Sequence, residues 1–284
     1  MTLSSTAEQP VLQRSIDDMV GASAAVDWSI CIRDAAGQEL AGCNPDRAMK
    51  TASVGKLLLL VEAARQCVEG ELAGAALLGK DSQLAVTDSG IWQHLDVDAL
   101  SVHDLCVLVA SVSDNLAANV LIKRVGLKRI GNLAQSLGLS QTALLDYVRD
   151  HRGPDVPVTL STGSASELSR VMNQLGRKEL VSPTVAAQVL AWLETGVDLS
   201  MVASPFGFDP LAHALSDREF FISNKTGADF GVRADIGMIG RNAVWYAYAV
   251  IANWDAAGPD RRDAALTGMR AVGTSLRNAI ECSA

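Results

Sequence analysis

The stretch TASVGKLLLL, residues 51–60, places a serine and a lysine three residues apart at the start of an apolar run. Residues i and i+3 share one face of a helix, so the amine of Lys56 is predicted to reach the hydroxyl of Ser53. The positive end of the helix dipole favours a developing alkoxide on that serine. Burial beside residues 57–60 would lower the pKa of the lysine and let it act as a base. The stretch therefore predicts a serine activated by a lysine.

Two simpler interpretations compete with this one. A phosphate-binding loop is excluded, because Lys50 and Leu57 stand where that loop requires Gly and Ser or Thr. The second is a lysine that extends from a helix end into water, which is the more common place for a single lysine. Gly55 costs about 1 kcal/mol relative to alanine inside a helix, which predicts that another part of the chain comes close to this turn. The serine and lysine alone leave the catalytic and the solvated interpretation open.

Length and composition predict a globular protein with a full core. The chain has 284 residues, of which 49% are hydrophobic and 20% charged, and a formal net charge of −8. One large domain or two packed lobes is expected. The negative charge and the lack of any basic run argue against nucleic acid and against a membrane surface as partners. Residues 1–20 do not resemble an export signal, and the longest apolar run is about half a membrane span, so a cytoplasmic location is expected.

The five cysteines and four histidines are widely spaced, and no CxxC pair occurs. This pattern fits reduced thiols better than a disulfide framework or a zinc site. We therefore expect neither a metal nor a cofactor.

Hydrophobic periodicity predicts a helical block between two ends that contain strands. Helical spacing over residues 8–20 is followed by a predicted hairpin with strands at 26–34 and 39–43. From residue 53 to about residue 200 the pattern is mainly helical. Three strands and a final amphipathic helix over residues 261–280 complete the chain.

The fold class expected from this order is α+β. The simplest assembly is one antiparallel sheet built from both ends of the chain, with flanking terminal helices and an inserted all-helical lobe. Residues 1–48 and 213–284 would form the α/β lobe, and residues 49–212 the helical lobe. A cleft between two such lobes is where a site is expected.

Two further motifs follow the first in the same order along the chain. SVSDNLAANVL contains Ser113-Asp114-Asn115, and Lys225-Thr226-Gly227 stands at the end of a predicted strand. Ser-x-x-Lys, then Ser-Asp-Asn, then Lys-Thr-Gly, is the signature of class A β-lactamases and penicillin-binding proteins. The chain resembles this family of serine hydrolases over nearly its whole length, and the 60 residues that separate Ser53 from Ser113 fit it closely. The resemblance implies the β-lactamase-like fold.

The resemblance also implies catalytic roles for four residues. Ser53 would attack an acyl carbonyl, with Lys56 assisting as the base. Ser113 would relay a proton to the leaving nitrogen or oxygen. Lys225 would act on that hydroxyl and attract a carboxylate of a small-molecule substrate.

Four more residues match positions that bind substrate in the family. Asn115 would hydrogen-bond the acyl side chain, and Thr226 would bind the substrate carboxylate. The backbone N–H groups of Ser53 and Ala228 would form the oxyanion hole. Arg233 would supplement the carboxylate site, or it is simply an exposed arginine of a strand.

One part of the family pattern is missing. Class A β-lactamases carry a Glu-x-x-Leu-Asn loop between the second and third motifs, and its glutamate activates the water that releases the acyl-enzyme. The comparable residues 143–161 contain no glutamate, and Val148 or Arg149 stands in its place. The alternatives are that Lys56 activates water or that another side chain of the loop replaces the glutamate. Three loop residues are candidates for that replacement, each with a solvated loop position as the alternative: Asp146, Asp150 and His151.

A second departure concerns a disulfide. Many family members bridge the position seven residues after the nucleophile to the position seven before the second motif. Those positions are Leu60 and Cys106 here, so this bridge cannot form. This agrees with the expected cytoplasmic location.

Three functions are open at this point. The first is a hydrolase that acts through a Ser53 acyl-enzyme on a β-lactam, cyclic amide or ester. The second is an acyl-trapping penicillin-binding protein, or an esterase, with little β-lactamase turnover. The third is a cell-wall peptidase, which the apparent lack of an export signal disfavours.

Overall fold

A five-stranded antiparallel sheet forms the centre of the computed structural model, which describes residues 5–211 and 220–283. The strand order is β2-β1-β10-β9-β8, so both ends of the chain contribute to one sheet, as the sequence predicted. The bounds are β1 Asp27–Asp34, β2 Glu39–Cys43, β8 Phe220–Asp229, β9 Val232–Arg241 and β10 Val244–Asn253. The α+β class is confirmed.

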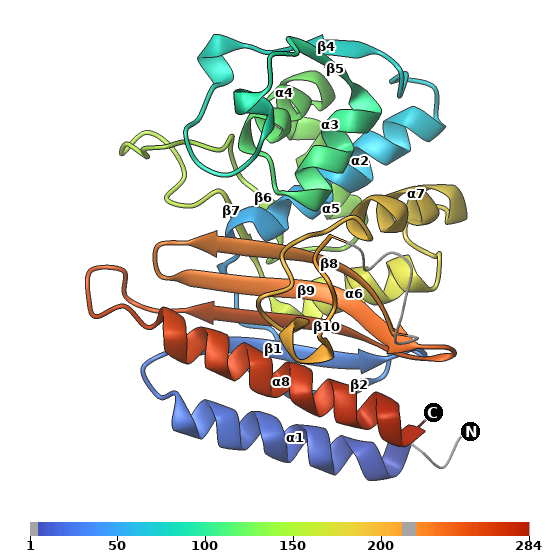
Figure 1. Cartoon of the computed structure of the whole chain (residues 1–284), viewed down its shortest axis with the longest axis vertical. Helices are drawn as coiled ribbons and strands as arrows, with labels where there is room; N and C mark the ends of the chain where they lie inside the picture. Colours follow the sequence, from blue (N-terminus) through green and yellow to red (C-terminus); the bar gives the residue numbers. More distant parts are fainter. Residues whose placement is uncertain (1–4, 212–219, 284) are drawn as a thin grey trace.

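The two terminal helices cover one face of the sheet. Figure 1 shows α1 (Ser5–Ala22) and α8 (Arg262–Ser283) side by side beneath the strands. Ile16 of α1 and Leu276 of α8 are buried in one hydrophobic cluster with Trp28 of the sheet. The opposite face is covered as well, so β10, between β1 and β9, is a continuous apolar run rather than an alternating one.

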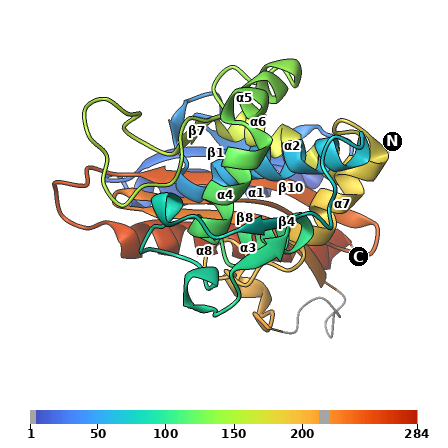
Figure 2. The same cartoon turned by 90° about the horizontal axis from the view of Figure 1, so that it is seen from above.

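The helical block covers the opposite face (Figures 1 and 2). Its α6 lies directly on the sheet, against β1, β9 and β10. Part of the predicted helical lobe therefore packs on the strands. The predicted boundary between the two lobes at residues 212 and 213 lies outside the described residues. The division into two lobes stays a prediction. The helices of the block are α2 Lys56–Val68, α3 Val102–Ser111, α4 Asn115–Val125, α5 Leu127–Ser136, α6 Ala165–Gly176 and α7 Pro183–Leu193.

Short elements connect these layers. They are β3 Met49–Lys50, β4 Leu77–Gly79, β5 Ala99–Ser101, β6 Ala143–Leu144 and β7 Ser161–Gly163, with 3-10 turns η1 Ala52–Gly55, η2 Ser82–Leu84, η3 Trp92–His94 and η4 Ser204–Phe206. The small sheet β3-β7-β6 lies at the base of α2 and ties the loop before β7 to the turn η1. In the described part of the chain, no helix is long and apolar enough to cross a membrane.

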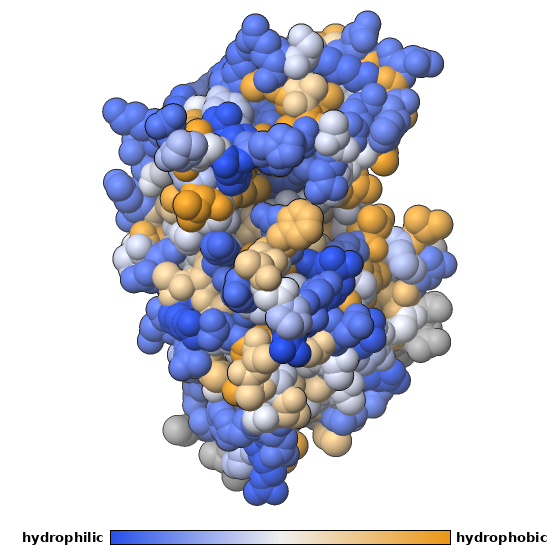
Figure 3. Space-filling view, turned by 90° about the vertical axis from the view of Figure 1, so that its left-hand side faces the viewer, coloured by the Kyte–Doolittle hydropathy of each residue, from blue (hydrophilic) through white to orange (hydrophobic). Residues whose placement is uncertain are grey.

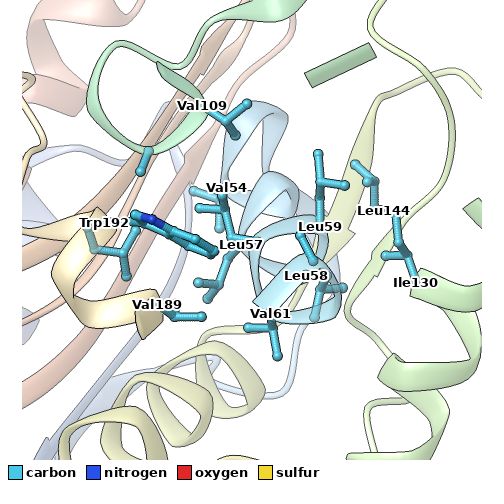
Figure 4. Packing of buried hydrophobic residues seen from close by; sticks show 14 of the residues in the cluster. Val54, Leu57, Leu58, Leu59, Val61, Val109, Ile130, Leu144, Val189 and Trp192 are labelled. Carbon is cyan, nitrogen blue, oxygen red and sulfur yellow. The ribbon is translucent and has the colours of Figure 1, made fainter. Parts of the chain in front are cut away.

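Helix α2 is the buried axis of the helical block. Figure 4 shows Leu57 on the side of Trp192, and Leu59 on the side of Leu144. Residues 57–60 are at most 2% exposed, and each such leucine stabilises the fold by about 1.5–3 kcal/mol relative to exposure. A helix that is apolar on every side must lie inside the protein. The residue at its first position, Lys56, is therefore drawn into the interior with it.

Candidate active site

Ser53 lies in the 3-10 turn η1, which leads into α2, and not in α2 itself. The preceding residue Ala52 has φ 48°, a left-handed conformation that is strained for a residue that carries a Cβ. Ser161 of β7 donates from Oγ to the carbonyl of Ala52 at 2.5 Å. A Cβ on Gly55 would lie 2.3 Å from Cβ of Ser161, so the predicted close approach to Gly55 comes from β7.

The third motif packs against the same turn from the other side. A Cβ on Gly227 of β8 would lie 2.3 Å from the carbonyl oxygen of Thr51 and 3.0 Å from the backbone nitrogen of Ser53. Only glycine allows the strand to approach so closely. The contact places Ala228, the next residue of β8, beside the turn that carries Ser53.

Lys56 is completely buried and lies behind the wall of the cleft. Its Nζ donates to the carbonyl and the hydroxyl of Ser113, at 2.6 and 3.2 Å, and to Oδ1 of Asn115 at 2.6 Å. Burial, and secondarily the positive charge of Lys225, hold the pKa of Lys56 well below its usual value. No hydrogen bond joins Lys56 to Ser53 in the described structure, because the nearby acceptors of the second motif occupy the amine. Such catalytic contacts often tighten only when substrate binds.

The second motif is organised around Asp114. Its carboxylate accepts hydrogen bonds from the backbone nitrogens of Ile91 and Trp92, at 2.8 Å each, and from that of Ala117 at 2.9 Å, where it caps α4. Ser113 before it has φ 57°, which turns its carbonyl and hydroxyl toward the amine of the first motif. Asp114 thus has a structural role. An Asp directly before an apolar helix indicates such a capping role in the sequence.

Lys225 is the second buried lysine of the site. It is 2% exposed, and its Nζ donates to the carbonyl of Thr226 at 2.9 Å. Burial lowers its pKa to about 8, against the opposing effect of the negative charges of Asp198 and Asp235. Its ammonium borders the cleft and carries no hydrogen-bonded carboxylate among the described residues, so it is available to an anionic group of a ligand.

A cleft of about 750 Å³ brings these groups together. It opens on the face shown in Figure 3, where hydrophilic and apolar groups meet at the boundary between the helical block and the sheet. Ligand pockets commonly have this volume and this mixture of polar and apolar walls. The predicted site residues among its lining are Ser53, Ser113, Asn115, Asp150, Lys225, Thr226 and Ala228.

The loop before β7 forms the wall of the cleft opposite β8. Val148 lines it, and the side chain of Asn119 holds the backbone of Val148 through bonds of 2.8 and 2.9 Å. Asp150 also lines the cleft, and its carboxylate accepts the backbone N–H of Thr87 at 3.0 and 3.2 Å. The third loop candidate, His151, is exposed at the same wall.

Besides Lys56, two predicted residues do not line the cleft. Asp146 is buried and pairs with Arg149 at 2.7 Å and Arg152 at 2.9 Å. These partners hold its pKa below the usual value although burial opposes them. Arg233 donates to the carbonyls of Asp229 and Val232, at 3.0 and 2.7 Å, within its own hairpin.

The cleft also contains residues that sequence reasoning did not single out: Asp88, Asp198, Asp229 and Phe230. Asp88 and Asp198 belong to separate loops, whereas Asp229 ends β8 and Phe230 follows it in the turn to β9. None of them belongs to a motif, so nothing in the sequence links them to the site. Phe230 is 86% exposed at the hairpin tip, which is unusual for an aromatic side chain away from a binding surface. Among the described residues, no group of three or more His, Cys, Asp or Glu side chains could hold a metal ion.

The structure brings the three ordered motifs together around one cleft, in a fold whose sheet is built from both ends of the chain. The chain belongs to the β-lactamase enzyme family, whose model matches residues 10–280. It is therefore a serine hydrolase of that family.

Several solved structures have the same fold as this chain. A β-lactamase from Sphaerobacter thermophilus is 23% identical, with a TM-score of 0.81, over 95% of this chain and 98% of that one. PBP-A is 22% identical, with a TM-score of 0.80, over 95% and 96% of the two chains. A leucine-to-glutamate mutant of PBP-A, solved as an acyl-enzyme complex with penicillin G, is 22% identical with a TM-score of 0.79 over the same shares.

Proposed function

We propose that Ser53 is the nucleophile of an acyl-enzyme reaction on a small amide, lactam or ester, and that Lys56 is its base. The observation that carries this proposal is the fully buried amine of Lys56, which is hydrogen-bonded to the cleft-lining Ser113 and follows the cleft-lining Ser53 by three residues. Burial lowers the pKa of Lys56, which favours the neutral amine that a base requires.

Acylation would proceed through three proton transfers. Lys56 accepts the proton of Ser53 as the Ser53 Oγ bond to the acyl carbonyl forms. Ser113, which is hydrogen-bonded to Nζ of Lys56, donates its proton to the leaving nitrogen or oxygen as the bond of that atom to the acyl carbon breaks, and it takes the proton of Ser53 from Lys56 in return. The backbone N–H groups of Ser53 and Ala228 would stabilise the oxyanion between these steps.

The binding roles would fall to the surrounding side chains. Asn115 receives Nζ of Lys56 on Oδ1 and donates from Nδ2 to the carbonyl of Asp88 at 3.1 Å, so it positions the base beside the acyl group. Lys225 and Thr226 would hold an anionic group of the substrate. Arg233 would have to leave its hairpin contacts to contribute there.

Release of the acyl group is expected to be slow. Val148 presents an apolar side chain to the cleft, and the loop of residues 143–161 contains no glutamate to activate water. Of the two candidate aspartates, Asp150 borders the cleft, whereas the carboxylate of Asp146 is neutralised by two arginines. Asp150 is therefore the proposed residual water activator. An acyl-trapping penicillin-binding function is the second candidate, and Val148 is the observation that favours it.

Intact-protein mass spectrometry after mixing with penicillin G, and separately with a small activated ester, tests the proposal. We expect a persistent adduct with penicillin G on Ser53 and little released product. Ser53→Ala should abolish the adduct, whereas Ser111→Ala, which removes another cleft-lining hydroxyl, should keep it. An adduct that survives Ser53→Ala, or rapid penicillin turnover by the wild type, would contradict the proposal.

A further inference from the structure

Asp198 lies at the end of the cleft formed by Lys225 and Thr226. It follows α7 in the chain, and its backbone carbonyl accepts Nδ2 of Asn224, the residue before Lys225, at 3.3 Å. Its Oδ1 accepts the backbone nitrogen and the hydroxyl of Ser200, at 3.3 and 2.7 Å. The carboxylate is thus fixed in place beside β8 and only partly exposed.

The second oxygen of this carboxylate is open to a ligand. In the part of the chain that the structure describes, Oδ2 of Asp198 has no hydrogen-bond partner, and no salt bridge joins it to Lys225. A carboxylate that served only to neutralise the lysine would be expected to contact it directly. The negative charge of Asp198 at the cleft is therefore not paired directly with Lys225.

The charge balance at this end of the cleft is unusual for a site that binds a simple anion. Lys225 lines it, and Arg233 lies nearby without lining the cleft, with its guanidinium bonded to carbonyls of its hairpin. Two carboxylates, those of Asp198 and Asp229, line the same end. The positive charges of Lys225 and of the nearby Arg233 are therefore offset by two carboxylates, so this end of the cleft presents both signs of charge to a ligand.

The pKa shifts of Lys225 and Arg233 agree with a position of Asp198 close to both. Burial lowers the pKa of both Lys225 and Arg233, and the negative charge of Asp198 opposes that effect in both. The carboxylate is thus close enough to influence any charge that Lys225 binds. A cation placed in the cleft would feel the same field.

We infer that Asp198 is a specificity-determining residue that binds a positively charged group, such as an ammonium, next to the substrate group held by Lys225. The substrate class is then a zwitterionic amide or ester, with an anionic group at Lys225 and a cationic group at Asp198. This inference rests on the proposed function, because it describes the substrate of the same Ser53 site.

Two matched esters of phenylacetic acid test the inference. Both release the same 3-hydroxybutanoate skeleton; one bears a trimethylammonium group at carbon 4, and the other bears a tert-butyl group of the same shape. Their acylation rates, measured as kcat/KM or as adduct formation on Ser53, compare a zwitterionic with a purely anionic leaving part. We expect the wild type to prefer the zwitterionic ester roughly tenfold, since opposite charges a few ångströms apart interact strongly at partly buried sites.

Asp198→Asn should remove this preference by slowing the zwitterionic ester and speeding the anionic one. Asp96→Asn makes the same change of charge on an exposed loop outside the cleft, and it should leave the preference intact. Thermal unfolding by circular dichroism shows that both variants are folded.

The outcomes separate the inference from the proposed function. Equal rates in the wild type, or an unchanged preference in Asp198→Asn, would overturn the inference. It also fails if penicillin labels Ser53 but neither ester reacts, and the proposed function then stands. If no compound labels Ser53, the proposed function fails, and the inference fails with it.

Discussion

Two walls of the same cleft are built very differently. The wall that holds the amine of Lys56 consists of helix ends and a strand, and its polar groups are buried and paired with one another. The opposite wall, within residues 143–161, is a loop with apolar Val148 at the cleft and with Asp146 paired away from it. The groups proposed for acylation are thus held in place by the fold, whereas the two candidate loop carboxylates in the described structure are either paired with arginines, at Asp146, or exposed, at Asp150.

Removal of the proposed base from the first wall should have the largest effect, on the rate of acylation. Lys56→Ala is expected to slow acylation of Ser53 about 100-fold or more, as loss of a general base usually does. The rate of adduct formation with penicillin G, followed by mass spectrometry, measures it. Lys50→Ala, at an exposed lysine of β3, is the matched control and should acylate normally. A folded Lys56→Ala protein that acylates within threefold of the wild type would show that the buried amine is not the base.

A carboxylate added to the loop wall should supply a base for deacylation, as the first wall supplies one for acylation. Val148→Glu is expected to shorten the lifetime of the penicillin adduct by roughly 10- to 100-fold, because general bases contribute factors of this size. The decay of the adduct over time measures it. Val158→Glu places the same charge on the same loop at a residue that is 82% exposed and outside the cleft lining, and it should have no effect. An unchanged lifetime in a folded Val148→Glu protein would mean that the loop does not aim this position at the acyl group.

The pKa of Lys225, about 8, predicts a pH dependence of substrate binding. As pH rises through 8 the ammonium loses its charge, so KM for a substrate with an anionic group should rise severalfold between pH 7 and pH 9. Lys225→Arg keeps its charge and should shift this rise to higher pH. A KM that is flat over this range would mean that Lys225 does not hold the anion.

The same shift has a consequence for stability. Because folding lowers the pKa of Lys225 from 10.5 to about 8, the unfolded chain binds more protons between these values. The contribution of this group to the free energy of unfolding therefore rises with pH from about 8 to 10.5 and is least favourable below pH 8.

The smallest effect is expected at the loop aspartates. Asp150→Asn should lower residual turnover of a small ester by only about two- to threefold, because the carboxylate is exposed and already accepts the N–H of Thr87. Asp146→Asn should lower the melting temperature through loss of its arginine contacts and leave the deacylation rate unchanged. Steady-state product release and thermal unfolding distinguish the two variants. A larger loss of turnover in Asp146→Asn than in Asp150→Asn would reverse this assignment.

Much of the fold follows from local patterns. The terminal helices, the hairpin of β1 and β2, and the strands β8–β10 were predicted because apolar spacing differs between helices and strands. The packing of α6 on the sheet was not predicted, since its pattern only requires an apolar partner and does not say which one. The same holds for the loop, where the sequence shows that glutamate is absent but not where Asp146 points.

The sequence by itself determined the chemistry of the first wall. The order and spacing of the motifs at Ser53, Ser113 and Lys225 specify which functional groups are present, and the apolar run after Lys56 forces that lysine into the interior. The tertiary structure alone decided what each amine contacts: Lys56 binds the second motif rather than Ser53, and Asp198 joins Lys225 in one cleft. The reason is physical, because a side chain's partners are set by distances between segments far apart in the chain, which local periodicity does not encode.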